Sequence, residues 1–326
     1  MRIVRNAVLA LLASGFMFAG IHSAAQEQEY PARAIRLIVP FAPGGGTELI
    51  AFLVRDGLNA RWAQPVVVDS RPGGTGALAA GIILNAPADG HTLMLVTSST
   101  HSIFPNVARR PPFDPVKDFS GVILAATAPN ILFVHPSVDA DSVKELVALA
   151  KAKPGVLNFG SPGIGTVGHL AGELFQSVTG TKLTHVPYKG SGTVLRALLG
   201  GEVHLGFSGP GSALAQVRAK KLKMIASGMP NRLSWLDLPT FVEAGYPTMQ
   251  AYNWYGIVAK AGTPQPIIDK LNQEMKRVLE DPQTVGIMLK RGYIATTTTP
   301  AEFDKLIRDD YEKWRKVVKT SGVQVD

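Results

Sequence analysis

A short apolar strand pattern, a loop rich in Gly or Pro and a helical pattern follow one another repeatedly along this chain. Residues 35–39 (IRLIV) are apolar and β-branched, residues 40–46 supply Pro and Gly, and residues 47–62 carry apolar side chains at helical spacing. Further strand patterns lie at residues 65–68, 93–96, 157–159, 183–186 and 203–207. Strands that alternate with helices and are apolar throughout are typical of parallel sheets covered on both faces. The sequence therefore predicts an α/β fold with mixed, mostly parallel sheets covered by helices.

Two helices have clear start signals. Ser142 precedes Glu145 by three residues, and Thr299 precedes Glu302 in the same way, with Pro300 between them. Both patterns are capping boxes, in which a hydroxyl and a carboxylate satisfy free amides of the first turn. The last helix also has an apolar stripe that must dock on another element, made of Phe303, Leu306, Ile307, Trp314, Val317 and Val318.

The size and composition of the chain indicate a large folded protein and exclude several kinds of site and partner. The chain has 326 residues, of which 46% are hydrophobic, enough for a large core and about two domains. It has no cysteine, which excludes disulfides, thiolate metal sites and cysteine nucleophiles. The formal net charge is +8, yet the densest basic run is only Lys220, Lys221 and Lys223. Without a basic cluster, no nucleic-acid partner is expected.

The first residues have the pattern of an export signal. Arg2 and Arg5 precede an apolar run over residues 7–19, and Ser23, Ala24 and Ala25 follow as small residues. The run is shorter than the roughly 20 residues that span a bilayer. We therefore expect a signal peptide over residues 1–25, cleaved after Ala25, and a periplasmic protein.

Two glycine-rich loops are candidate anion sites, because each follows a strand pattern and opens a helix. They are PFAPGGGTE, residues 40–48, and GSPGIGTVG, residues 160–168. Glycines expose consecutive amides, and a helix N-terminus adds about half a positive charge. The alternative is that the glycines only permit tight turns and the hydroxyls only cap the helices. The predicted ligand-binding residues are Phe41, Gly45, Gly46, Thr47, Ser161, Gly163, Gly165 and Thr166, with Ser98, Lys189 and Ser208 as further side-chain contacts.

The sequence gives little support for a dinucleotide site, a metal site or a hydrolase. Gly163, Gly165 and Gly168 match a dinucleotide fingerprint, but the next strand pattern lacks the acidic residue that would hold a ribose. There is no GxSxG motif and no HxxxH pair, so neither a nucleophile elbow nor a helical zinc site is predicted. Ser98 with His101 is the best candidate for a hydrolase, without an evident orienting acid. His169 is interpreted as structural. We expect no cofactor, no metal and no enzymatic activity.

The chain resembles the Bug-type periplasmic receptors, the substrate-binding components of tripartite tricarboxylate transporters. The similar segments run in order along nearly the whole mature chain: YPARAIRLIVPFAPGGGTE, VVDSRPGGTG, ADGHTLML, LNFGSPGIGT, HVPYKGSG, LLGGEVHLGFSG, LPTFVEAGYP and NWYGIVAKAGTP. Glu48 and Phe52 depart from the Asp and Arg that the family usually carries at these positions.

The resemblance implies a two-domain clamshell fold with the ligand in an interdomain cleft. Domain 1 would comprise residues 26–125 plus 255–326, and domain 2 residues 126–254, with crossings near residues 122–129 and 253–259. The two glycine-rich loops would hold the ligand's carboxylate between them. The expected function is capture of a small organic acid by a monomeric receptor that delivers it to membrane permease subunits. The alternatives are a sensor that reports its ligand to a two-component system and an exported α/β hydrolase.

Overall fold

The structure, a computed structural model, describes residues 30–41, 46–188, 190–210 and 213–324. The chain divides into two compact units, residues 1–32 and 33–326, and the fold below is that of the second unit. The expected signal peptide lies outside the described residues. Within the described ranges, every helix is too short or too polar to cross a membrane.

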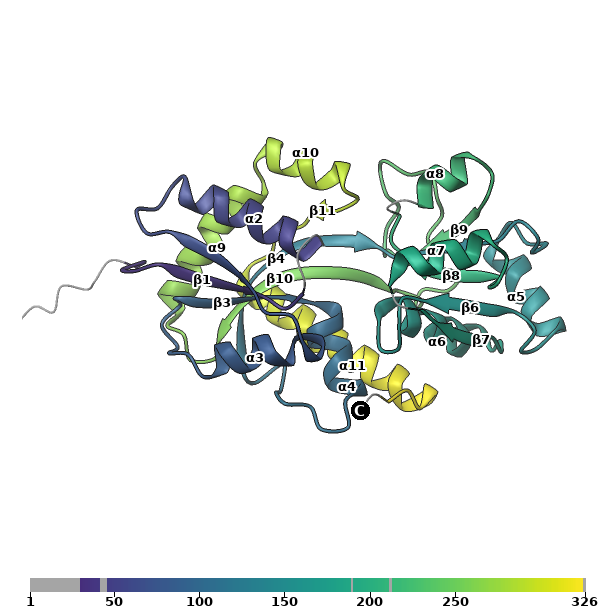
Figure 1. Ribbon diagram of the computed structural model, residues 1–326, viewed down its shortest axis with the longest axis horizontal. Helices are drawn as coiled ribbons and strands as arrows, with labels where there is room; N and C mark the ends of the chain where they lie inside the picture. Colours follow the sequence, from purple (N-terminus) through teal and green to yellow (C-terminus); the bar gives the residue numbers. More distant parts are fainter. Residues whose placement is uncertain (1–29, 42–45, 189, 211–212, 325–326) are drawn as a thin grey trace, which may run out of the picture. The chain divides into compact units, whose positions relative to one another are not determined.

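The first sheet has six strands in the order β11-β4-β10-β3-β1-β2. They are β1 (Ile35–Val39), β2 (Val66–Ser70), β3 (Thr92–Thr97), β4 (Phe119–Pro129), β10 (Tyr252–Lys260) and β11 (Ile294–Ala295). Figure 1 shows helices on both faces of this sheet. Helices α2 (Gly46–Asn59) and α9 (Gln265–Leu279) cover one face, and α3 (Ala77–Leu84) and α11 (Pro300–Ser321) cover the other. The sheet is therefore covered on both sides, as the apolar strand patterns predict.

The second sheet has five strands in the order β7-β6-β8-β5-β9. They are β5 (Ile131–Val134), β6 (Asn158–Ser161), β7 (Thr184–Pro187), β8 (Leu205–Ser208) and β9 (Lys223–Ser227). One face packs on α5 (Val143–Ala152) and α6 (Val167–Thr179), and the other on α7 (Ser191–Leu199) and α8 (Ala213–Arg218). The shorter elements are α4 (Phe104–Val107), α10 (Pro282–Lys290) and the single turns η1 (Gly74–Gly76) and η2 (Ser98–Ile103).

Both sheets are mixed, and they are less parallel than the sequence pattern suggests. Among the described strands, four pairs are parallel and five are antiparallel. The parallel pairs involve β1 to β3 and β6 to β8, which are joined through helices. A parallel neighbour needs such a crossover. The long strands β4 and β10 carry the chain from one sheet to the other. They are not joined to each other by a helical crossover within one sheet, and they pair antiparallel.

Helix α11 joins two hydrophobic cores. Phe303 and Ile307 pack in a cluster with α3 and the six-stranded sheet. Trp314, Val317 and Val318, further along the same helix, pack with residues of α5, α6 and the five-stranded sheet. The predicted apolar stripe thus docks on two cores. Both predicted capping boxes are confirmed, at Ser142 with Glu145 and at Thr299 with Glu302.

Candidate functional site

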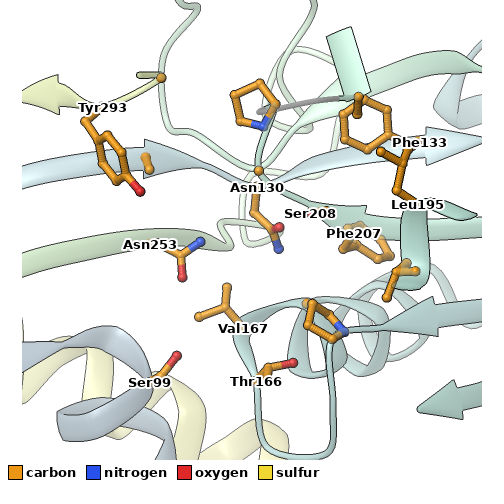
Figure 2. A pocket seen from close by; sticks show the side chains of 18 of the residues that line it. Ser99, Asn130, Phe133, Thr166, Val167, Leu195, Phe207, Ser208, Asn253 and Tyr293 are labelled. Carbon is orange, nitrogen blue, oxygen red and sulfur yellow. The ribbon is translucent and has the colours of Figure 1, made fainter. Parts of the chain in front are cut away.

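A pocket of about 380 Å³ lies where elements of both sheets meet, a volume suited to a small organic molecule. Figure 2 shows it from close by. The six-stranded sheet and its connections contribute Ser99, Ala128, Asn253, Tyr255, Arg291, Gly292 and Tyr293. The five-stranded sheet and its helices contribute Phe133, Pro162, Thr166, Val167, Gly168, Val194, Leu195, Leu198, Phe207, Ser208, Gly209, Pro210 and Ala213. Asn130 stands between the two sets, since β4 ends at Pro129 and β5 begins at Ile131.

Asn130 places a buried hydrogen-bond donor in the pocket wall. Its side chain is 2% exposed, and its Nδ2 has no hydrogen-bond partner among the described residues. In Figure 2 its amide points into the pocket beside that of Asn253. A buried polar group without a partner costs about 1–3 kcal/mol. An acceptor bound in the pocket would remove that cost, so Asn130 is placed to donate to a ligand.

The N-terminus of α6 forms another part of the wall. Thr166 caps the helix, because its Oγ1 accepts from the His169 amide at 3.3 Å and donates to the Gly163 carbonyl at 2.8 Å. The amides of Val167 and Gly168, at the start of the first turn, have no carbonyl of their own helix to bind. With the helix dipole they make this corner of the pocket attractive to an anion. Gly168 is required here, since a Cβ would lie 2.6 Å from the Phe207 carbonyl oxygen.

The loop before α6 is held by two stacked imidazoles. The rings of His169 and His185 lie 3.8 Å apart at 13°. His169 Nδ1 accepts from the Gly165 amide at 3.2 Å, and His185 Nε2 lies 2.7 Å from Ser161 Oγ. Burial lowers the pKa of His169 to about 3, with a further contribution from His185. Burial also lowers the pKa of His185 to about 4, so both rings are neutral at neutral pH.

Two tyrosines and one arginine occupy the wall formed by the six-stranded sheet. The Tyr255 and Tyr293 rings lie 5.4 Å apart at 77°, and their hydroxyls are hydrogen-bonded. Burial raises the pKa of both phenols, so both stay protonated. The charge of Arg291 acts in the opposite direction on the pKa of Tyr293. Among the described residues that line the pocket, Arg291 is the only charged one.

The predicted ligand-binding residues fall into four groups. Thr166 and Ser208 line the pocket. Ser161, Gly163 and Gly165 shape the loop that leads to it through the hydrogen bonds above and the bond from the Gly163 amide to Ser161 Oγ at 3.3 Å. Phe41, Gly46, Thr47 and Ser98 are described but are not among the lining residues. Gly45 and Lys189 lie outside the described residues. The role of each in binding stays a prediction.

Ser98 and His101 do not form a hydrolase pair. The residues after β3 form the helical turn η2, in which Thr97 and Thr100 make a capping box. Both Ser98 and His101 are fully buried. His101 Nδ1 lies 3.2 Å from Thr100 Oγ1, while Ser98 Oγ has no partner among the described residues. Among the residues that the structure describes, no group of acidic and histidine side chains could hold a metal ion.

Sequence reasoning missed the residues that come from the crossings and from the loop after α10. Asn130, Asn253 and the pair Arg291 and Tyr293 come from three separate parts of the chain, and none of them is among the predicted ligand-binding residues. A signal was available for Asn130, because it is the only strongly polar residue between Gly121 and Val134 apart from Thr127. An amide within such an apolar run needs a partner, which marks a candidate site.

Comparison with known proteins identifies the family. Residues 50–323 match the model of the tripartite tricarboxylate transporter family receptors. Protein BugT of Bordetella pertussis is 32% identical, with 98% of each chain aligned. A structure described as a periplasmic transporter is 38% identical, with a TM-score of 0.75 over 91% of this chain and 100% of that one. The R. palustris protein Rpa4515, solved with adipate, is 33% identical, with a TM-score of 0.76 over 91% of this chain and 99% of that one. This chain therefore belongs to the tripartite tricarboxylate transporter receptor family.

Proposed function

We propose that this protein is an exported receptor that binds a small organic carboxylate in the pocket and presents it to membrane permease subunits. The observation that carries the proposal is the buried Asn130 amide, which points into the pocket at the passage between the sheets. Carboxylate oxygens are strong acceptors, and hydrogen bonds to a charged group contribute about 1.5–3 kcal/mol each. The family and the adipate bound by a relative support the same class of ligand.

The carboxylate sits between Asn130 and the α6 N-terminus. The amides of Val167 and Gly168 and the Asn130 amide are neutral donors that converge on the same pocket, with the half-charge of the helix dipole behind them. Arg291, which also lines the pocket, adds a positive charge. The pocket therefore attracts an anion. A cation would be repelled by Arg291 and would find hydrogen-bond donors where it needs acceptors.

Binding favours closure of two domains around the ligand. The pocket takes residues from elements of both sheets, so a ligand that touches both walls stabilises the state in which they are close. The domains are residues 26–125 with 255–326 and residues 126–254. The permease recognises the closed form. The mature chain begins after Ala25 and acts as a monomer in the periplasm.

The test is a thermal-shift and calorimetric panel of small acids against the purified mature protein. Each acid is paired with its primary amide, which has a similar shape but no charge. An acid at about 100 times its dissociation constant adds about 2.7 kcal/mol to the free energy of unfolding. We expect acids to raise the melting temperature and the amides to leave it unchanged.

Two variants locate the site. Asn130→Leu keeps the side-chain size and removes the donor, so we expect acid binding to weaken at least tenfold. Asn231→Leu is the control, because Asn231 is exposed and does not line this pocket. Equal binding by the two variants, or no stabilisation by any acid, would contradict the proposed function.

A further inference from the structure

The pocket has one strongly apolar side, which the proposed carboxylate does not use. Its lining residues are Phe133 from β5, Val194, Leu195 and Leu198 from α7, and Ala213 from α8, here called the apolar pit. Four of them belong to the hydrophobic core between the five-stranded sheet and these helices, and Leu195 packs against that core. The pocket thus borders a hydrophobic core, with Leu195 the most exposed of the five residues, and Figure 2 shows Phe133 and Leu195 together on this side.

Most of the polar lining residues lie elsewhere, and Ser208, at the end of β8, stands between them and the apolar pit. Asn130, Asn253 and Tyr293 face the pocket from the crossings and the loop after α10, and Thr166 stands at the start of α6 (Figure 2). Arg291, the only charged lining residue in the described part of the chain, belongs to the wall of Tyr293. A carboxylate inside the apolar pit would lose its hydration without gaining a donor, which is strongly unfavourable. The two sides of the pocket therefore suit two different parts of one molecule.

We infer that the ligand is a monocarboxylate whose hydrocarbon or aromatic body fills the apolar pit. This inference rests on the proposed function, since the carboxylate remains at Asn130 and the α6 N-terminus. It adds the chemical nature of the other end of the ligand. That end is an unsubstituted apolar tail, with no second charge and no hydroxyl groups. Burial of each additional methylene strengthens binding about fourfold until the pit is full.

The experiment measures binding of butyrate, hexanoate, octanoate, adipate and hexan-1-ol to the purified mature protein by calorimetry. Hexanoate and adipate have six carbons each and differ by the second carboxylate. We expect affinity to rise from butyrate to hexanoate, hexanoate to bind at least tenfold more tightly than adipate, and hexan-1-ol not to bind. Adipate binding as tightly as hexanoate, or no gain with chain length, would overturn the inference and leave the proposed function intact. Failure of every acid to bind would overturn both.

Two variants on one helix locate the tail. Leu195→Asn places an amide in the pit, and we expect at least tenfold weaker hexanoate binding. Leu199→Asn is the matched control, one turn further on, because Leu199 packs against the same core but does not line the pocket. Ala213→Leu fills the pit without a polar group and should shorten the longest acid that binds. Hexanoate affinity equal in Leu195→Asn and Leu199→Asn, or an unchanged length limit in Ala213→Leu, would count against the inference.

Discussion

A Cβ atom at Gly46 would overlap the hydroxyl oxygen of Tyr293, so the start of α2 is in direct contact with a residue of the pocket wall. The last glycine of the first glycine-rich loop therefore acts on the pocket by leaving room for this phenol. Tyr293 in turn is hydrogen-bonded to the half-buried Tyr255. The three residues form one packed unit, and both tyrosines line the pocket.

Gly46→Ala should disturb this unit. The added methyl group displaces Tyr293, and the half-buried Tyr255 hydroxyl loses its partner, which costs about 1–3 kcal/mol. We expect a loss of about 2 kcal/mol in urea unfolding and roughly tenfold weaker acid binding by calorimetry, a magnitude that follows from that cost. Gly286→Ala in α10 is the control, because its Cβ would meet nothing within 4 Å. It should stabilise the protein by about 0.5–1 kcal/mol, and similar behaviour of the two variants would refute the role of Gly46.

Gly168→Ala tests the close contact between α6 and β8. Its Cβ would lie 2.6 Å from the Phe207 carbonyl oxygen, so the helix start must move away from the strand. We expect a loss of about 1–3 kcal/mol in the free energy of unfolding, as for other overpacked sites. Because the α6 amides move with the helix, acid affinity should fall as well. Gly81→Ala in α3 has open space around its Cβ and should instead be stabilising; wild-type binding by Gly168→Ala would show that this contact does not position the site.

Local patterns in the sequence predict the elements well, because they depend on neighbours in the chain. The strand at residues 35–39 and both capping boxes are found where the pattern places them. The second glycine-rich loop does open a helix whose N-terminus lines the pocket. The predicted proportion of parallel pairs is too high, since periodicity reports burial on two faces and not strand direction.

The composition of the pocket could not be predicted in the same way. Ser161 looks like a ligand hydroxyl in sequence, but in the structure its Oγ lies 2.7 Å from His185, a residue 24 positions away. Tyr293 reaches the pocket only because β11 pairs with β4, which no local pattern encodes. Ser99 lines the pocket while its neighbour Ser98 is buried, because the helical turn η2 sends adjacent side chains in different directions.

Asp310→Ala should destabilise the attachment of α11. Asp310 is buried, accepts a 2.7 Å hydrogen bond from Trp254 Nε1 and pairs with Lys313. Its loss leaves the buried Trp254 indole N–H without this acceptor and Lys313 with only the Gln250 carbonyl to donate to, which costs about 3 kcal/mol. Asp309→Ala is a matched control on the same helix, since Asp309 is exposed and pairs with Lys305 on the surface. We expect Asp309→Ala to change the free energy of unfolding in urea by about 0.5 kcal/mol or less, and equal effects of the two substitutions would contradict the role of Asp310 in attaching α11.

His101→Leu should weaken the acid sensitivity of the fold. His101 is fully buried between Phe113 and Phe119, and burial lowers its pKa to about 3. The unfolded chain has a histidine pKa near 6.5, so below that pH the unfolded state binds the proton and the folded state does not. The stability due to the neutral ring is complete above about pH 6.5 and is lost as the pH falls towards 3, by at most about 1.4 kcal/mol per pH unit.

The measurement compares the free energy of unfolding at pH 7.5 and pH 5 for wild type and His101→Leu. We expect the difference between the two pH values to shrink by about 2 kcal/mol in the variant, with the remaining decrease due in part to His169 and His185. Phe113→Leu is the control, because it removes packing from the same cluster without removing a titratable group. It should lower stability equally at both pH values. If His101→Leu instead lost as much stability at pH 5 as wild type, the buried neutral imidazole would not be a source of the acid sensitivity.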